Sequence, residues 1–230
     1  MGGRRPTFIE IGLGILALGA PLAIGAVHVA TIVTLAIIAV LLLGALALRT
    51  RHSGDKIAVP WFGAILFGLA AWTAFQALPL PWTLLATIAP KTAAVLEVAF
   101  GATARPAWHA MSLAPTATLL EALKVSIVFI AFIVAHNHLS HEGRRQRLLL
   151  SFVILASVVT LLGLLGAVVA PGKPLLFYQP QSATRAGGLI ATSFVNSNHG
   201  GAFLSLSAMA ALALALWEEN LQRRVMLLAA

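Results

Sequence analysis

The polar residues best suited to chemistry gather in one stretch, which begins at Arg185 and leads into a long apolar run. Within it, Asn196, Asn198 and His199 stand directly before the pair Gly200 and Gly201. Polar side chains at the mouth of a membrane helix are costly unless they bind a ligand or one another. We therefore expect the specific function of the chain to be encoded in this stretch.

Each of these residues has two interpretations. The planar guanidinium of Arg185 can grip a phosphate, or it can reach out to lipid headgroups. Asn196 and Asn198 can cap the following helix, or their amides can contact sugar hydroxyls or a phosphate at its N-terminus. His199 is a candidate general base or phosphate partner, and its alternative role is structural. These four residues are the predicted substrate-binding residues, and the sequence identifies no catalytic residue beyond His199 as a candidate.

The composition indicates an integral membrane protein. The chain is 60% hydrophobic and 10% charged, whereas a soluble domain is about half apolar and about a quarter charged. The net charge of +8 comes from short basic clusters between apolar runs, a placement typical of topology determinants rather than of nucleic-acid binding. The chain has no cysteine, which excludes disulfides and thiolate metal sites. Because His136, His138 and His141 lie among arginines, we expect no metal site there either.

The apolar runs predict an all-α fold, a polytopic transmembrane helix bundle within a single membrane domain over residues 1–230. A span takes about 20 apolar residues. The expected spans are about 8–27, 29–48, 57–78, 118–136, 148–170 and 199–217, with a seventh starting at 225. The seventh run stops after six residues, so we expect the chain to be the N-terminal part of a longer protein. In the first span, Gly12, Gly14 and Gly19 suit close helix packing.

The connecting segments differ in length and composition. Two long connectors, at about 79–117 and 171–198, contrast with short polar linkers at 49–56, 137–147 and 218–224. The first long connector is rich in proline and tryptophan, and we expect a short interfacial helix at 92–100 within it. We expect Thr116 to cap the fourth span, with Pro115 just outside that helix, and Glu121 to pair with Lys124.

The basic residues predict the orientation. Most fall at the N-terminus and in the three short linkers, so the positive-inside rule places the N-terminus in the cytoplasm. The two long connectors, and the stretch from Arg185 to His199, then face the other side. Nucleotides are absent there in a bacterium, and a transfer reaction on that face needs a donor that is already activated and carried by lipid.

Two segments carry a family resemblance. The run Thr192-Ser-Phe-Val-Asn-Ser-Asn-His-Gly-Gly-Ala-Phe-Leu204 resembles the G-T-F-x-N-x-N-H-x-A motif of the O-antigen ligase superfamily. That group includes lipopolysaccharide O-antigen ligases, Wzy-type polysaccharide polymerases and protein O-oligosaccharyltransferases. The run Met111-Ser-Leu-Ala-Pro-Thr-Ala-Thr118 resembles the S-L-x-P-x-A-T segment of the family. The chain departs from the motif at residues 191–194 and at Gly200 and Gly201. The later half of the family, with its catalytic His and Arg, does not occur within these 230 residues.

The resemblance implies a glycosyl transferase in the bacterial cytoplasmic membrane that moves a glycan from undecaprenyl pyrophosphate to a lipid or glycan acceptor. It implies no nucleotide or metal cofactor and no nucleic-acid partner, and it assigns a phosphate contact to Arg185. The membrane lipids are the remaining expected partners. A Wzy-type polymerase is the first alternative, since it differs only in its acceptor. A non-catalytic membrane transporter or scaffold is the second.

Overall fold

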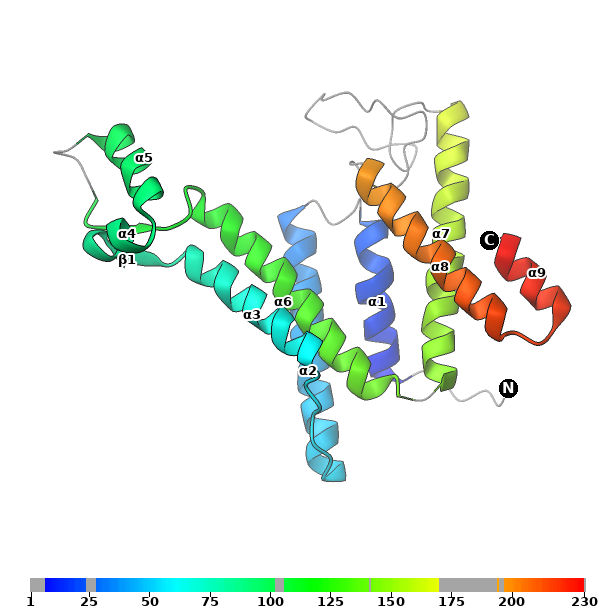
Figure 1. Ribbon diagram of the computed structural model, residues 1–230. Coiled ribbons are helices and arrows are strands. Elements are labelled where there is room, and N and C mark those ends of the chain that lie inside the picture. The colour runs from blue at the N-terminus through cyan, green and yellow to red at the C-terminus, as the bar shows by residue number, and fades with distance from the viewer. Residues whose placement is uncertain are drawn as a thin grey trace. The chain divides into compact units, whose positions relative to one another are not determined.

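The structure is a computed structural model, and it describes residues 7–23, 28–101, 106–140, 142–169, 194 and 197–229. These residues are mainly helical (Figure 1). Four of the described helices are long and apolar enough to cross a membrane. They are α2 (Val29–Ser53), α6 (Pro115–His138), α7 (Glu142–Val169) and most of α8 (Ser197–Trp217). The chain is therefore an all-α helical protein of the membrane type, as its apolar runs predict.

Two further apolar helices are shorter. They are α1 (Phe8–Leu22) and α3 (Trp61–Gln76). At about 1.5 Å per residue, the 16 residues of α3 reach about 24 Å, less than the hydrocarbon thickness of about 30 Å. Helix α3 starts later than the predicted residue 57 because Pro60 is its N-cap and biases the preceding residue toward extended backbone. The expected number of six full spans stays a prediction.

The chain divides into two compact units, Met1–Ile57 with Val134–Ala230, and Ala58–Ile133. In the first unit, α1 packs against α2 and α7, and α7 packs against α8 (Figure 1). A short amphipathic helix, α9 (Leu221–Ala229), packs against α8. The most deeply buried side chains of this unit include Leu42, Leu46 and Val159, which come from α2 and α7.

One glycine brings α1 close to α2. A Cβ atom at Gly12 would lie 2.4 Å from Cδ2 of Leu42, a buried side chain, so any larger residue would force Leu42 to shift. A Cβ at Gly14 would meet nothing within 4 Å, and one at Gly19 would lie 3.8 Å from Leu35, an ordinary contact. The predicted packing role of small residues thus holds for Gly12, whereas a Cβ at Gly14 would touch nothing in the described part of the chain.

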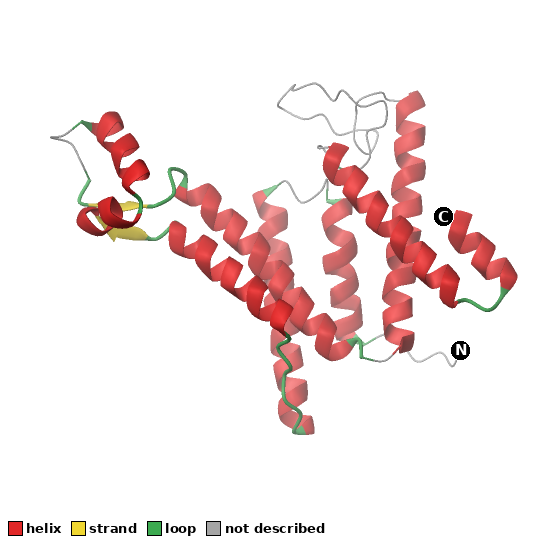
Figure 2. Cartoon of the chain, in the orientation of Figure 1, coloured by secondary structure: helices red, strands yellow, loops and turns green. Residues whose placement is uncertain are grey.

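The second unit contains a small two-stranded sheet that the sequence pattern did not predict. Strands β1 (Pro79–Pro81) and β2 (Trp108–Ala110) pair antiparallel, with Leu80 opposite His109 (Figure 2). Between them lie α4 (Trp82–Ile88) and α5 (Pro90–Phe100). The expected short helix at 92–100 is confirmed as α5, which starts two residues earlier at Pro90, because proline is well suited to the first turn of a helix.

The short polar linkers are more helical than expected. Helix α2 continues through the basic residues to Ser53 and ends at Gly54, whose φ of 75° is left-handed. Helices α7 and α9 begin at Glu142 and Leu221, so their first turns carry arginines that were expected in linkers. Arginine is a good helix former, and each helix therefore extends until a capping residue or a turn stops it.

Helix α6 starts one residue before the expected cap, whereas the charged pair expected in its first turns is present. Thr116 is not the N-cap, since Pro115 is already the first helical residue. Instead, Ser112 stabilises the entry to the helix: its Oγ accepts a hydrogen bond from the Ala114 amide at 3.0 Å. Lys124 donates to Glu121 at 2.7 Å, which confirms the predicted pair on an exposed face.

Candidate functional site

Two of the four predicted site residues lie in the described part of the chain. Asn198 and His199 occupy the first turn of α8, and both side chains are exposed. Arg185 and Asn196 lie outside the described residues. The structure fixes where Asn198 and His199 stand relative to α7.

The start of α8 lies at the far end of α7 from the arginines of that helix. Phe203, near the start of α8, belongs to one buried cluster with Leu155 and Val159, whereas Ala211 and Leu214, further along α8, belong to another with Val153. The two helices therefore run in opposite directions (Figure 1). Asn198 and His199 consequently stand toward the C-terminal end of α7.

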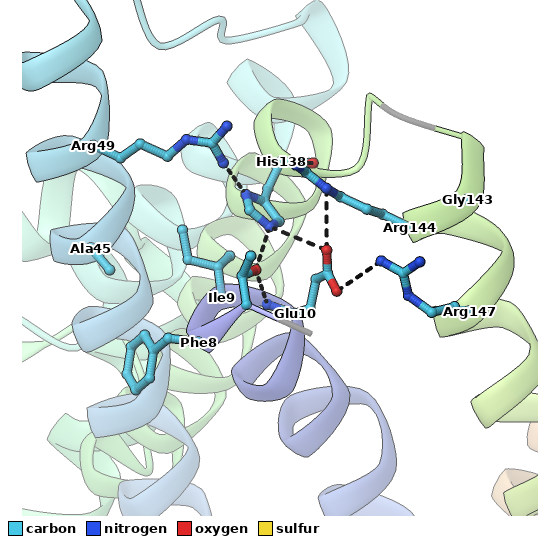
Figure 3. A pocket seen from close by; sticks show the side chains of 10 residues that line it. Phe8, Ile9, Glu10, Ala45, Arg49, His138, Gly143, Arg144 and Arg147 are labelled. Carbon is cyan, nitrogen blue, oxygen red and sulfur yellow. Dashed lines mark hydrogen bonds and ion pairs between the residues drawn. The ribbon is translucent and has the colours of Figure 1, made fainter. Parts of the chain in front are cut away.

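A second polar cluster forms at the N-terminal end of α7, where the ends of α1, α2 and α6 also meet (Figure 3). Its side chains come from positions far apart in sequence, and they are Thr7, Glu10, Arg49, His138, Arg144 and Arg147. We call this set the arginine cluster. All six residues belong to the first compact unit.

Thr7 and Glu10 are positioned by the start of α1. Thr7 is the N-cap of this helix, and its Oγ1 accepts a hydrogen bond from the backbone amide of Glu10 at 3.3 Å. A threonine cap followed three residues later by glutamate is a common helix start. The carboxylate of Glu10 also benefits from the positive end of the helix dipole.

His138 lies at the centre of the cluster, and its side chain is fully buried. Arg49 Nη1 lies 2.5 Å from its Nδ1, and Thr7 Oγ1 lies 2.9 Å from its Nε2. A guanidinium can only donate, so Nδ1 must accept. The imidazole is then neutral, with its proton on Nε2, which donates to the Thr7 hydroxyl oxygen.

Glu10 is held by two arginines of α7. Arg144 Nε lies 3.2 Å from one carboxylate oxygen, and Arg147 Nη2 lies 3.1 Å from the other. Arg144 also donates from Nη1 to the backbone carbonyl of His138 at 3.1 Å, which satisfies an acceptor at the end of α6. The side chain of Glu10 is only 10% exposed, whereas that of Arg147 is 50% exposed.

These residues line a cavity of about 590 Å³. Three guanidiniums outnumber one carboxylate, and His138 is neutral in this arrangement, so the cluster carries an excess of two positive charges. Glu10, the one carboxylate of these six residues, is engaged by two arginines. The arrangement favours binding of an anion over proton transfer. Among the described residues, no group of three or more His, Cys, Asp or Glu is placed to hold a metal ion.

Sequence reasoning missed this cluster because its members lie in four separate helices. Thr7 and His138 are 131 residues apart, and Arg49 and His138 are 89 apart. In the sequence, the arginines resemble topology determinants of the short polar linkers. One signal was available: Glu10 is an acidic residue within an apolar run, and such a residue needs a cationic partner.

Comparison with known proteins adds no relative. No protein-family model matches the chain, and neither a curated protein nor a solved structure matches it.

Proposed function

We propose that this chain belongs to an O-antigen ligase-like glycosyl transferase in the bacterial cytoplasmic membrane. The observation that carries the proposal is the resemblance of Thr192–Leu204 to the asparagine–histidine motif of that superfamily. The substrate would be a glycan on undecaprenyl pyrophosphate, and the product a glycan joined to a lipid or sugar hydroxyl.

Two structural features support this proposal. Asn198 and His199 are exposed in the first turn of an apolar helix, where an amide, an imidazole and the N-terminal end of a helix can meet a phosphate or a sugar. The second family-like segment, Met111–Thr118, leads into α6, another helix long enough to cross a membrane. Both segments thus stand at the mouths of apolar helices, where a lipid-carried donor would present its headgroup.

The reaction needs a base and cationic groups. An acceptor hydroxyl oxygen would attack the anomeric carbon of the glycan, and the bond from that carbon to the phosphate oxygen would break. Undecaprenyl pyrophosphate would leave, and Arg185 would stabilise its charge. A base would take the acceptor proton, and His199 is the candidate within this chain. Asn196 and Asn198 would hold the pyrophosphate or the sugar hydroxyls.

Deletion and complementation test the proposal in cells. The full-length gene, or its Arg185→Ala or Asn198→Ala variant, is returned to a strain deleted for it, and lipid-linked glycan and surface glycan are measured. Leu206→Ala is a matched control, because Leu206 is an exposed apolar residue of the same helix. We expect lipid-linked glycan to accumulate in the deletion strain and in both polar variants, and to be cleared by wild type and Leu206→Ala.

The same experiment separates the alternatives. Loss of long glycan chains with single repeat units still joined to the final acceptor would identify a polymerase. An unchanged surface glycan in the deletion strain would overturn the transferase proposal and favour a transporter or scaffold.

A further inference from the structure

We propose that the arginine cluster is a binding site for the phosphate of an anionic phospholipid. This inference does not depend on the transferase proposal, because it concerns the opposite end of α7 from Asn198 and His199. It rests on the charge of the cluster, its free donors, the apolar part of its lining and its place at the ends of the helices.

The charge of the cavity favours an anion. Arg49, Arg144 and Arg147 face one carboxylate, that of Glu10, and the buried His138 is neutral in its contact with Arg49. The protein therefore leaves two positive charges uncompensated within the cluster. A phosphodiester would compensate one of them and would make charge-assisted hydrogen bonds, which are stronger than neutral ones.

The arginines retain donors for such a ligand. Each guanidinium has five N–H groups. Arg147 contacts Glu10 through Nη2, and Arg49 contacts His138 through Nη1. Among the described residues, these contacts leave further donors on both groups. Arg147 is also 50% exposed, so a ligand can reach it without breaking the buried part of the network.

The remaining lining indicates a lipid rather than a soluble phosphate. Phe8, Ile9 and Ala45 line the same cavity, and 64% of the surface of Phe8 is exposed. Ala45 lies one turn before Arg49, toward the middle of α2, and Figure 3 shows Phe8 on that side of the cavity. A ligand with a phosphate beside the arginines would thus place its glycerol and acyl groups against apolar side chains.

The location agrees with a headgroup site. The arginines lie at the ends of α2 and α7, both long enough to cross a membrane. The positive-inside rule predicts that this face is cytoplasmic, and the cytoplasmic leaflet is the one that presents anionic lipid. The cavity would therefore meet anionic headgroups at high local concentration.

Lipid titration of the purified full-length protein tests the site. Dioctanoyl phosphatidylglycerol and dioctanoyl phosphatidylcholine are added in detergent, and bound lipid is counted by native mass spectrometry. We expect the anionic lipid to bind at least about tenfold more tightly, and Arg147→Gln to weaken it by about tenfold, as loss of a charge-assisted hydrogen bond predicts. Arg147→Lys keeps the charge and should recover part of the binding.

Arg145→Gln is the matched control. Arg145 is exposed on the same helix and lies over the ring of Trp217, 5.1 Å from its centroid, outside the cavity. Arg145→Gln should change the affinity for the anionic lipid by no more than about twofold, because a charge outside the cavity adds only diffuse attraction. An equal loss in Arg145→Gln and Arg147→Gln would show diffuse attraction and overturn the site. Full displacement of the lipid by inorganic phosphate would overturn the lipid assignment, and equal binding of the two lipids would overturn both.

Discussion

Arg49 donates a hydrogen bond to Nδ1 of His138, which joins the C-terminal end of α2 to the C-terminal end of α6 across 89 residues of sequence. The guanidinium fixes the tautomer, because it leaves the imidazole proton on Nε2. That nitrogen faces Thr7 at 2.9 Å and Glu10 at 3.8 Å, both at the start of α1. One buried histidine thus connects three helices, and α7 joins them through the carboxylate of Glu10.

Replacement of His138 should destabilise the protein strongly. His138→Ala removes a buried side chain and leaves Arg49 and Thr7 without their partner, which should lower the free energy of unfolding by about 2 to 4 kcal/mol. Denaturation of the full-length protein in detergent measures this change. His52→Ala is the control, because His52 is exposed on α2 and contacts only a carbonyl of its own helix within the described chain. If the two variants lower the free energy of unfolding equally, the contacts of His138 within the cluster do not stabilise the protein.

Neutralising Glu10 should also destabilise the protein, by a smaller amount. Glu10→Gln leaves Arg144 and Arg147 close together without a counter-charge. We expect the free energy of unfolding to fall by about 1 to 3 kcal/mol. The fall should be near the lower value, because water screens the half-exposed Arg147. Glu142→Gln serves as control, since Glu142 is exposed and bonds only Gln146 of the same helix among the described residues. Thermal unfolding compares the two, and an unchanged midpoint for Glu10→Gln would contradict the ion-pair role.

The close approach of α1 to α2 gives a matched pair of glycine variants. Gly12→Ala places a methyl group against buried Leu42 and should cost about 1 to 3 kcal/mol through overpacking. Gly14→Ala meets open space and should be neutral or stabilising by up to about 1 kcal/mol, because alanine is the better helix former. The unfolding midpoints of the two variants are compared with that of the wild type. A loss of the same size in Gly14→Ala would show that the contact with Leu42 is unimportant.

The end of α2 depends on a glycine with left-handed backbone. Gly54 has a φ of 75°, and a Cβ there would be strained although no atom lies within 4 Å. Gly54→Ala should lower stability by about 1 kcal/mol, whereas Gly44→Ala, in the open middle of the same helix, should not. Circular dichroism during thermal unfolding reports both. If Gly54→Ala unfolds at the wild-type temperature, the C-cap is not what ends α2.

Much of the helical fold was predictable from local pattern. Long apolar runs predicted α2, α6, α7 and α8, and the prolines of the first connector bracketed α5. The strands β1 and β2 were not predictable, because three residues such as Pro-Leu-Pro carry too little alternation. The helix ends were misjudged where basic residues continue a helix, as Arg49 does in α2.

The site was predictable only in part. The stretch around Asn198 stood out because its polar residues are contiguous in sequence. The arginine cluster did not, because packing of α1, α2, α6 and α7 brings Glu10 and Arg147 together from 137 residues apart. A long-range ion pair of this kind depends on which helices are neighbours, and the sequence of one helix does not contain that information.

The most direct test of the transferase account is transfer in a reconstituted system. The full-length gene product in proteoliposomes is given a glycan on undecaprenyl pyrophosphate and a candidate acceptor, and glycan and free carrier are measured by mass spectrometry. The account predicts that wild type joins the glycan to the acceptor and releases undecaprenyl pyrophosphate in equal amount, and that Asn198→Ala is slowed at least about tenfold. The account would be contradicted if the wild-type protein left the donor unreacted with every acceptor molecule to which the cell joins its surface glycan.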